Sequence, residues 1–340
     1  MPLRTWRLFI GFLLCLGLLL TACQLAQPPA APTSAAARQK LAVGYVALNA
    51  TQLPSWVAQE EGIFDKNSLD VDLHYLPTST SPTAAILAGE IDVAIIAEQA
   101  IQASLNGADL VYVAAPTSNI FFSLYTRPEI SDAASLKGKK VGITGPGAAT
   151  ETAAKLALRS LRLDPSTDVA LTNLGSAANI LAALQAGAVD AGVLSSPTNL
   201  QAKALGMREL VNTARLNDPF PSAWAAASKK YIADHTDAMR RFVKSMAEAL
   251  AFEINHPEPT QQILAKYVKI DDPAVARAAY EEVVPYLNKT LAPDPEAVRS
   301  ALREQSAAMP QAASADAANF IDSRFTDELE ASGFIKGLYP

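Results

Sequence analysis

The chain has 340 residues, of which 50% are hydrophobic and 18% are charged, and its formal net charge is -6. This length suits about two domains at ~150 residues each. The composition excludes a disordered chain, a collagen-like chain and a strongly basic nucleic-acid binder. Because the chain has only two cysteines, Cys15 and Cys23, and three histidines, we expect no disulfide framework, no metal site and no cofactor.

Residues 1–22 predict a signal peptide. Arg4 and Arg7 precede an apolar run over residues 8–20, which is shorter than the ~20 residues of a membrane span. The following residues, Leu20-Thr21-Ala22-Cys23, resemble the lipobox of bacterial lipoproteins. This resemblance implies cleavage before Cys23, lipidation of that cysteine, and an extracytoplasmic protein anchored to the cell membrane, on the periplasmic face or the cell surface. An ordinary signal peptide with an incidental cysteine is the alternative.

Residues 23–40 then predict the lipidated cysteine and a disordered tether. The segment is rich in Ala, Pro, Ser and Gln and has no hydrophobic period. Such a tether would let the folded part lie away from the membrane surface.

From residue 41 onward, short β-branched runs alternate with helical patterns. The expected strands are residues 41–46, 69–76, 91–96, 139–144, 168–173 and 189–194, and the expected helices are residues 54–61, 82–88, 148–161 and 177–186. Strands separated by single helices favour right-handed crossovers and mostly parallel sheets. Because the rhythm restarts at residue 139, we expect an α/β fold with two doubly wound lobes.

An internal repeat at an offset of 98 residues supports two related lobes. Ala88-Gly89-Glu90-Ile91-Asp92 corresponds to Ala186-Gly187-Ala188-Val189-Asp190, and Val43-Gly44 corresponds to Val141-Gly142. Each match alone is weak, since glycine often ends a helix and aspartate often follows in the turn. Two matches at one offset, in corresponding elements, favour a structural duplication.

The chain after Trp224 predicts helices only. Apolar residues recur at helical spacing over residues 230–255, and further helices are expected at residues 261–268, 273–284, 295–309 and 315–330. Breaks that contain proline, at residues 255–257 and 292–295, separate them. We expect this helical C-terminal extension to pack on the first lobe.

Several short motifs, in this order, resemble the substrate-binding proteins of ABC importers. The motifs are Gly62-Ile63-Phe64, the strand Leu69-Asp70-Val71-Asp72-Leu73, AILAGEIDV at residues 85–93 and LKGKKVG at residues 136–142. The most similar branch is the one for sulfonates, taurine, nitrate and thiamine-pyrimidine precursors, and the resemblance covers residues 41–330. It implies the periplasmic binding protein type 2 architecture, in which a hinge of two crossings joins two lobes and a ligand lies between them. Lobe 1 would comprise residues 41–124 and 225–340, lobe 2 would comprise residues 125–224, and the crossings would lie near residues 122–127 and 217–224.

The resemblance also implies the partners of the protein. Members of this family capture a small molecule and deliver it to the transmembrane subunits of an ABC permease. We therefore expect a small-molecule ligand, a permease and, through the lipid anchor, a membrane as partners. We expect a monomer that binds no nucleic acid.

Ligands of open parallel sheets bind beyond the carboxyl ends of the strands, where helix N-termini present free N–H groups. In this chain the corresponding loops carry hydroxyl and amide groups, with Glu98 and Glu151 as their only charges. The candidate ligand-binding residues are Asn49, Thr51, Trp56, Thr78, Ser79, Glu98, Thr150, Glu151, Ser195 and Trp224, and further aromatic candidates are Tyr45, Phe121 and Tyr125. The alternative for each hydroxyl is a helix cap, and the alternative for Trp56 and Trp224 is a place in the core.

Two carboxylates without a cation favour a neutral or amine-bearing ligand, such as a heteroaromatic thiamine-pyrimidine precursor or a flavin. The alternative is an organic or inorganic oxyanion, such as an aliphatic sulfonate, taurine, nitrate or bicarbonate, held by loop N–H groups. A further alternative is an enzyme of the thiamine-pyrimidine synthase type. Because His74, His235 and His256 lie outside these loops and no set of nucleophile and base is apparent, we expect a binding protein and no catalytic residue.

Overall fold

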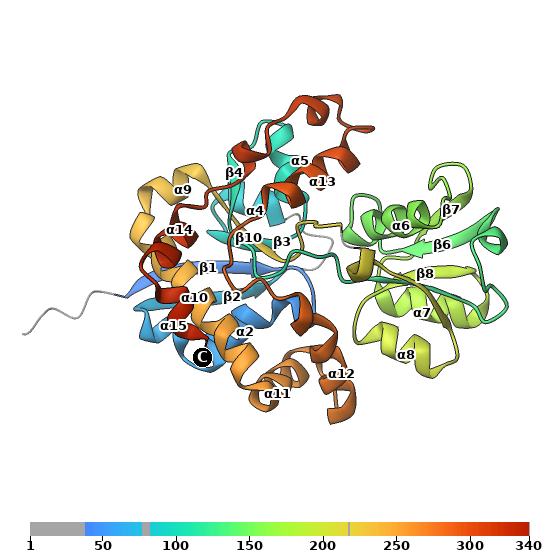
Figure 1. Ribbon diagram of the computed structural model, residues 1–340, viewed down its shortest axis with the longest axis horizontal. Coiled ribbons are helices and arrows are strands. Elements are labelled where there is room, and N and C mark those ends of the chain that lie inside the picture. The colour runs from blue at the N-terminus through green and yellow to red at the C-terminus, as the bar shows by residue number, and fades with distance from the viewer. Residues whose placement is uncertain (1–37, 77–81, 217, 340) are drawn as a thin grey trace, which may run out of the picture. The chain divides into compact units, whose positions relative to one another are not determined.

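The computed structural model describes residues 38–76, 82–216 and 218–339. The expected signal peptide, Cys23 and most of the expected tether lie outside the described residues, as do the candidate residues Thr78 and Ser79. The described part contains two five-stranded sheets with helices around them (Figure 1). In this part of the chain, no helix has the length and apolar character needed to cross a membrane.

The first sheet has the strand order β2-β1-β3-β10-β4. Its strands are β1 (Gln39–Tyr45), β2 (Leu69–Tyr75), β3 (Val93–Ile96), β4 (Leu110–Ala114) and β10 (Trp224–Ser228). Strand β1 is parallel to β2 and β3, whereas β10 is antiparallel to β3 and β4. We call this sheet and the helices on it the first lobe.

The second sheet repeats this arrangement with the order β7-β6-β8-β5-β9. Its strands are β5 (Ser123–Thr126), β6 (Lys139–Ile143), β7 (Val169–Asn173), β8 (Ala191–Leu194) and β9 (Arg208–Asn212). Strand β6 is parallel to β7 and β8, and β5 is antiparallel to β8 and β9. We call this sheet and its helices the second lobe. The expected α/β architecture with two lobes is confirmed, although the sequence did not predict β4, β5, β9 and β10.

The connecting helices follow the expected rhythm closely. In the first lobe they are η1 (Ala50–Gln52), α2 (Leu53–Glu60), α3 (Ile63–Lys66), α4 (Pro82–Ala88) and α5 (Gln99–Leu105). In the second lobe they are η2 (Ala134–Leu136), α6 (Ala149–Ser160), α7 (Ala177–Ala186), α8 (Thr198–Ala204) and η3 (Thr213–Leu216). Helix α7 shows why its bounds could be predicted. The Ser176 side chain accepts a hydrogen bond from the Asn179 N–H, and Gly187 ends the helix with a φ of 69°.

The repeat seen in the sequence corresponds to equivalent contacts in the two lobes. Asp92 Oδ2 accepts from the Ala42 N–H at 2.8 Å, and Asp190 Oδ2 accepts from the Lys140 N–H at 3.0 Å. Each aspartate also donates its own N–H to the carbonyl of the same partner residue. In the first lobe these bonds hold the turn before β3 to β1. In the second lobe they hold the turn before β8 to β6 in the same way.

The two repeated glycines, Gly44 in β1 and Gly142 in β6, lie where an added Cβ would force a neighbouring leucine side chain to move. An added Cβ would lie 2.6 Å from Leu76 Cδ1 at the first position and 2.9 Å from Leu174 Cδ1 at the second. We expect Gly44→Ala and Gly142→Ala each to lower the free energy of unfolding by about 1–3 kcal/mol through overpacking. Urea unfolding measures this. Gly337→Ala, where an added Cβ meets nothing within 4 Å, is the control and should not destabilise. If all three variants unfold alike, close packing does not explain the two repeated glycines.

The chain after β10 is helical, as the sequence predicts. Its helices are α9 (Lys229–Asp234), α10 (Thr236–Asn255), α11 (Pro257–Val268), α12 (Pro273–Val283), η4 (Val284–Tyr286), α13 (Pro295–Gln305), η5 (Pro310–Ser314), η6 (Ala317–Phe320), α14 (Arg324–Ala331) and α15 (Phe334–Leu338). The helix expected over residues 230–255 is divided at His235. The helix expected over residues 315–330 is divided because Ile321 forms a β-bridge with Tyr112 and the Asp322 N–H donates to the Tyr112 carbonyl.

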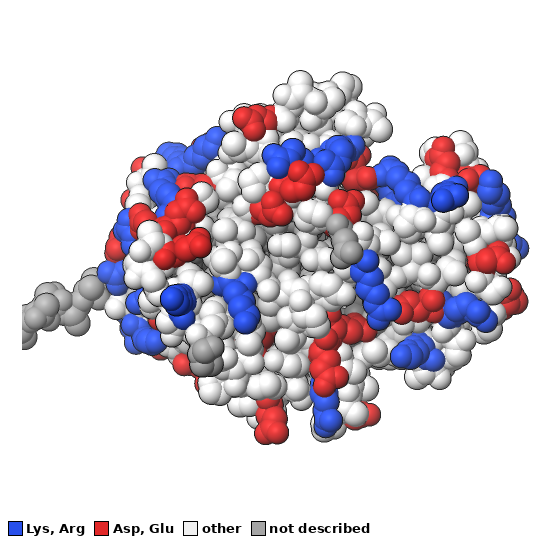
Figure 2. Space-filling model, viewed as in Figure 1, with Lys and Arg blue, Asp and Glu red and all other residues white. Residues whose placement is uncertain are grey.

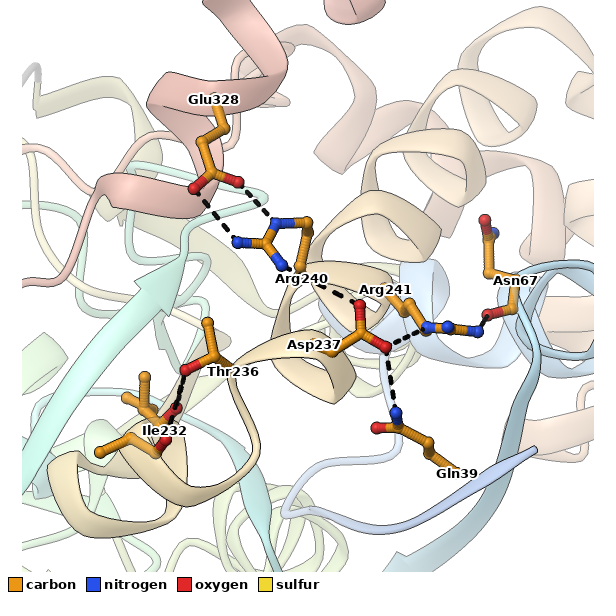
Figure 3. A network of polar contacts seen from close by, with 9 residues as sticks. Gln39, Asn67, Ile232, Thr236, Asp237, Arg240, Arg241 and Glu328 are labelled. Atoms are coloured by element: carbon orange, nitrogen blue, oxygen red, sulfur yellow. Dashed lines mark hydrogen bonds and ion pairs between the residues drawn. The ribbon is translucent and has the colours of Figure 1, made fainter. Parts of the chain in front are cut away.

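The helical extension packs on the first lobe (Figure 1). Helix α10 contacts α2, α3, β2 and β4, and α13 contacts α5. Polar contacts at the start of α10 join it to β1 of the lobe and to α14 of the extension (Figure 3). Asp237 accepts from Gln39 Nε2 at 3.0 Å and from Arg241 Nε at 2.8 Å, and Arg240 Nε donates to Glu328 Oε2 of α14 at 2.7 Å. The packing of the extension on the first lobe is therefore confirmed.

Candidate functional site

The chain crosses between the lobes twice, once between β4 and β5 and once between η3 and β10. The two crossings are hydrogen-bonded to each other. Thr117 Oγ1 donates to the Ser222 carbonyl at 2.6 Å, and the Phe220 N–H donates to the Ser118 carbonyl at 2.9 Å. Two adjacent segments without regular structure form the connection on which a hinge motion between the lobes would depend.

Trp224, a candidate ligand contact, lies in the core where the second crossing enters β10. Its side chain is fully buried, and its ring makes an edge contact with Tyr112, with centroids 5.2 Å apart and an interplanar angle of 87°. Its Nε1 donates to the Thr117 carbonyl on the other crossing. These contacts give Trp224 a structural role, because they pack it in the core and connect the two crossings.

Asn49, Thr51 and Trp56 lie together in the first lobe, directly after β1. Asn49 Oδ1 caps η1, because it accepts from the Thr51 N–H at 3.1 Å and from Thr51 Oγ1 at 2.7 Å. Trp56 is fully buried, stacks on Tyr267 at 4.7 Å and contacts Tyr45 edge-on at 5.6 Å. Both alternatives considered for these residue types, a cap and a core position, are therefore seen here.

Glu98 and helix α6 make a direct polar contact between the lobes. Thr152 Oγ1 in the second lobe donates to Glu98 Oε1 in the first lobe at 2.6 Å. Glu98 is fully buried, and its second carboxylate oxygen has no hydrogen-bond partner among the described residues. Burial raises the pKa of Glu98 above its ordinary value, although the hydrogen bond from Thr152 acts in the opposite direction. The hydrogen bond between Thr152 and Glu98 therefore joins the two lobes through a carboxyl group whose burial disfavours its charged form.

Thr150 and Glu151, at the start of α6, interact within their own lobe. Thr150 Oγ1 accepts from the Thr144 N–H at 2.9 Å. Glu151 accepts from the Gly147 N–H at 2.6 Å and forms an ion pair with Lys155 at 2.8 Å. Partial burial acts to raise the pKa of Glu151, but the hydrogen bonds from Lys155 and Gly147 lower it overall. Ser195 is half-buried directly after β8. A ligand role for these residues stays a prediction.

A pocket of about 370 Å³ lies between the second lobe and the C-terminal helices that pack on the first lobe. We call it the interlobe pocket. Its lining residues come from the segment around β5, from α8, from β9 and η3, and from α12 and η4: Phe121, Phe122, Ser123, Tyr125, Asn199, Leu200, Lys203, Glu209, Asn212, Ala214, Arg215, Ala278, Glu281, Glu282, Pro285 and Tyr286. Its volume lies in the range of small-molecule sites.

One contact spans this pocket from the second lobe to α12. Asn199 Nδ2 donates to both oxygens of Glu282, at 3.0 and 3.1 Å. Asn199 is 3% exposed, so its amide is held in place by the packing around it. Burial raises the pKa of Glu282 above its ordinary value, and the nearby Glu209 carboxylate raises it further.

Among the described residues, none of the candidate ligand-binding residues lines this pocket, and only two of the further aromatic candidates do. Phe121 and Tyr125, named as aromatic candidates, line the pocket. Asn199 lies in the first turn of α8, shortly after β8, so the strand-end rule points to its position. Glu282 and Tyr286 carry no such signal, because they lie in the helical extension, far along the chain from every predicted loop.

The charged groups of the described residues bear on two kinds of site, a metal site and a charged surface patch. Among the described residues, no group of three or more His, Cys, Asp and Glu side chains is placed to hold a metal ion. His74 lies on β2, His235 lies between α9 and α10, and His256 lies between α10 and α11. On the face drawn in Figure 2, basic and acidic side chains are interspersed.

The family of the chain follows from comparison with known proteins. Residues 49–260 match the model of the family described as NMT1/THI5 like, and the chain belongs to this family. Relatives from Brucella abortus (strain 2308) and Brucella suis biovar 1 (strain 1330), each named only as a candidate binding protein, are 26% identical over 246 residues. These residues are 67% of this chain and 72% of each relative.

Solved structures with the same fold include named binding proteins. The periplasmic aliphatic sulphonate binding protein SsuA from Escherichia coli has a TM-score of 0.69 at 22% identity, over 80% of this chain and 92% of that one. The periplasmic nitrate-binding protein NrtA from Synechocystis PCC 6803 has a TM-score of 0.69 at 14% identity, over 89% and 91%. At these identities the similarity shows the periplasmic binding protein fold and nothing about the ligand.

Proposed function

We propose that the protein is the solute-binding component of an ABC importer, which captures a small molecule between its lobes and delivers it to the permease subunits. The observation that carries the proposal is the interlobe pocket. One of its walls is formed by the second lobe, and the other is formed by α12 and η4 of the helical extension. The family and the names of the relatives with this fold support it. Nothing in the described site calls for a catalytic role.

The proposed mechanism is closure of the lobes on the ligand. Both walls of the pocket must come together before a ligand can contact the second lobe and α12 at once. A ligand that binds this closed arrangement better than an open one shifts the population towards it, and the permease distinguishes the two by the relative placement of the lobes. The contacts Asn199–Glu282 and Thr152–Glu98 would form or break in this motion.

We propose a neutral or heteroaromatic ligand first, such as a thiamine-pyrimidine precursor or a flavin, because Phe121, Tyr125 and Tyr286 line the pocket with rings. An oxyanion such as a sulfonate or nitrate is the second candidate. Lys203 and Arg215, which also line the pocket, favour it. The relatives named for sulphonate and nitrate support the same candidate.

We further propose that the protein works outside the cytoplasm as a monomer, anchored to the membrane through a lipid on Cys23. The resemblance of Leu20-Thr21-Ala22-Cys23 to a lipobox supports the lipid anchor. Labelling of cells with a radioactive or alkyne-tagged fatty acid tests it, since Cys23→Ala should abolish incorporation.

Solution scattering combined with thermal stability tests the proposed function. We expect at least one ligand from a screen of thiamine precursors, flavins, sulfonates, nitrate and bicarbonate to raise the melting temperature of residues 24–340. The same ligand should reduce the radius of gyration. A ligand that stabilises the protein without any compaction would contradict the closure mechanism.

A further inference from the structure

Three carboxylates line the interlobe pocket, and two of them lie on opposite walls. The third, Glu281, is exposed on α12 beside Glu282. Glu209 lies on β9 in the second lobe, and Glu282 lies on α12 in the helical extension. Burial raises the pKa of the Tyr125 hydroxyl, and the negative charges of Glu209 and Glu282 raise it further. Both carboxylates are therefore near one ring in the pocket.

The hydrogen-bond donors of these two carboxylates are neutral. Glu209 Oε1 accepts from Ser123 Oγ at 2.6 Å and from Asn212 Nδ2 at 3.2 Å, and Glu282 accepts from Asn199. Ser123 and Asn199 are 2% and 3% exposed. Buried neutral groups thus hold both carboxylates in place. No cation within ion-pairing distance balances either of them in the described part of the chain.

The aromatic residues add a second feature that suits a cation. Tyr125 is 3% exposed, and Phe121 contacts Tyr286 edge-on at 5.6 Å. Ring faces attract an ammonium or guanidinium group within ~6 Å, and more strongly where water is excluded. The negative charges of Glu209 and Glu282 repel each other. A positive group between them would reduce this repulsion.

Lys203 and Arg215 are the cations on the lining of the pocket. Both side chains are exposed, as is that of Glu209. The charge of Lys203 acts to lower the pKa of Glu282, and that of Arg215 acts to lower the pKa of Tyr125, but burial raises both pKa values overall. The three carboxylates of the lining outnumber these two cations. The deeper lining, by contrast, consists of the half-buried Glu282, the hydroxyl and amide donors that hold the carboxylates, and the rings.

We infer that the interlobe pocket binds an organic cation, a protonated amine on an aromatic or apolar body, with Glu282 and Glu209 at the ammonium and Tyr125 against the body. This inference rests on the proposed function. It keeps the aromatic body of the first ligand candidate and adds a positively charged amine to it. Glu282 lies on the wall opposite Asn199 and Tyr125. A cation bound to Glu282 would therefore contact the second lobe only when the two walls are close together, which couples its binding to closure.

A matched set of probes tests the inference: benzylammonium, the neutral benzyl alcohol and the anionic benzoate, with methanesulfonate as a second anion. Binding is measured by ligand-observed NMR and by thermal shift on residues 24–340. We expect benzylammonium alone among them to bind and stabilise. Glu282→Gln keeps the size and one of the two acceptor oxygens for Asn199. It should weaken benzylammonium binding by about ten- to a hundredfold, the loss of one charge-assisted contact.

Glu330→Gln is the control, because it makes the same change of charge at an exposed position on α14 that does not line the pocket. It should leave benzylammonium binding unchanged and melt like the parent without ligand. Because Glu282 is partly buried and contacts Asn199, binding to Glu282→Gln is compared at a temperature at which that variant is folded. Binding and compaction with benzoate or methanesulfonate alone would overturn the cation inference and leave the proposed function standing. Benzylammonium binding that survives Glu282→Gln unchanged would overturn the assignment to this pocket.

Discussion

Trp224→Ala should lower the free energy of unfolding by about 3–5 kcal/mol, the usual range for removing a fully buried tryptophan. The ring is 0% exposed, packs edge-on against Tyr112, and donates from Nε1 to the Thr117 carbonyl on the other crossing. The substitution removes this packing and leaves the carbonyl without its donor. Chemical denaturation at neutral pH measures the loss.

Trp224→Phe separates packing from the hydrogen bond. It keeps an aromatic ring against Tyr112, so the expected loss is smaller than for alanine, with about 1–3 kcal/mol from the unpaired Thr117 carbonyl. If Trp224→Ala left stability unchanged but abolished ligand binding, the residue would belong to the ligand site that the sequence indicated, and the assignment to the core would be wrong.

The secondary structure of the lobes could be predicted because local signals and tertiary structure agree there. The helix expected at residues 177–186 is α7 because Ser176 and Gly187 cap it, and the repeated glycines and aspartates mark equivalent turns in both sheets. The missed strands β5 and β10 pair antiparallel within sheets assembled from other parts of the chain. Their pairing depends on where the chain crosses between lobes, which hydrophobic periodicity does not encode.

The candidate site could be predicted only in part, for a related reason. The rule that ligands lie at strand ends selects residues by position in the chain, and so it points to Glu98, Thr150 and Asn199. It does not distinguish a side chain that faces a ligand from one that caps a helix, as Asn49 does, or packs in the core, as Trp224 does. Glu282 reaches the pocket only because α12 packs beside η1, a tertiary contact without a local signal.

Glu253 carries the second large expected effect. It lies in α10, is 0% exposed, and neither carboxylate oxygen has a hydrogen-bond partner among the described residues. Burial alone raises its pKa well above the ordinary value of a glutamate. Near Glu253, burial raises the pKa of Tyr280 to about 12, and the charge of Glu253 adds to that shift. The folded protein thus strongly prefers the protonated form of Glu253.

The sign of the pH dependence follows from this raised pKa. Below the pKa of a glutamate in the unfolded chain, ~4.3, Glu253 is protonated in both states and does not oppose folding. As the pH rises through the raised pKa of the folded state, the unfolded chain binds fewer protons than the folded one, and stability falls. At pH 8 the carboxyl group therefore opposes folding, whether it stays protonated or ionises inside the core.

Glu253→Gln should remove this dependence, because the amide has nearly the same shape and does not ionise. We expect the variant to match the parent near pH 4 and to be more stable at pH 8 by about 1–3 kcal/mol. At pH 8 the parent must take up a proton or bury a charge in order to fold, and each unit by which a pKa is raised corresponds to about 1.4 kcal/mol. Glu258→Gln, at an exposed position in the first turn of α11, is the control and should show no such gain. Urea unfolding of the three proteins across this pH range measures the difference. Glu98 and Glu282 also have raised pKa values. The stability of the variant should therefore still depend on pH, although less steeply than that of the parent. A variant no more stable than the parent at pH 8 would mean that Glu253 has a partner or water in solution that satisfies its carboxylate.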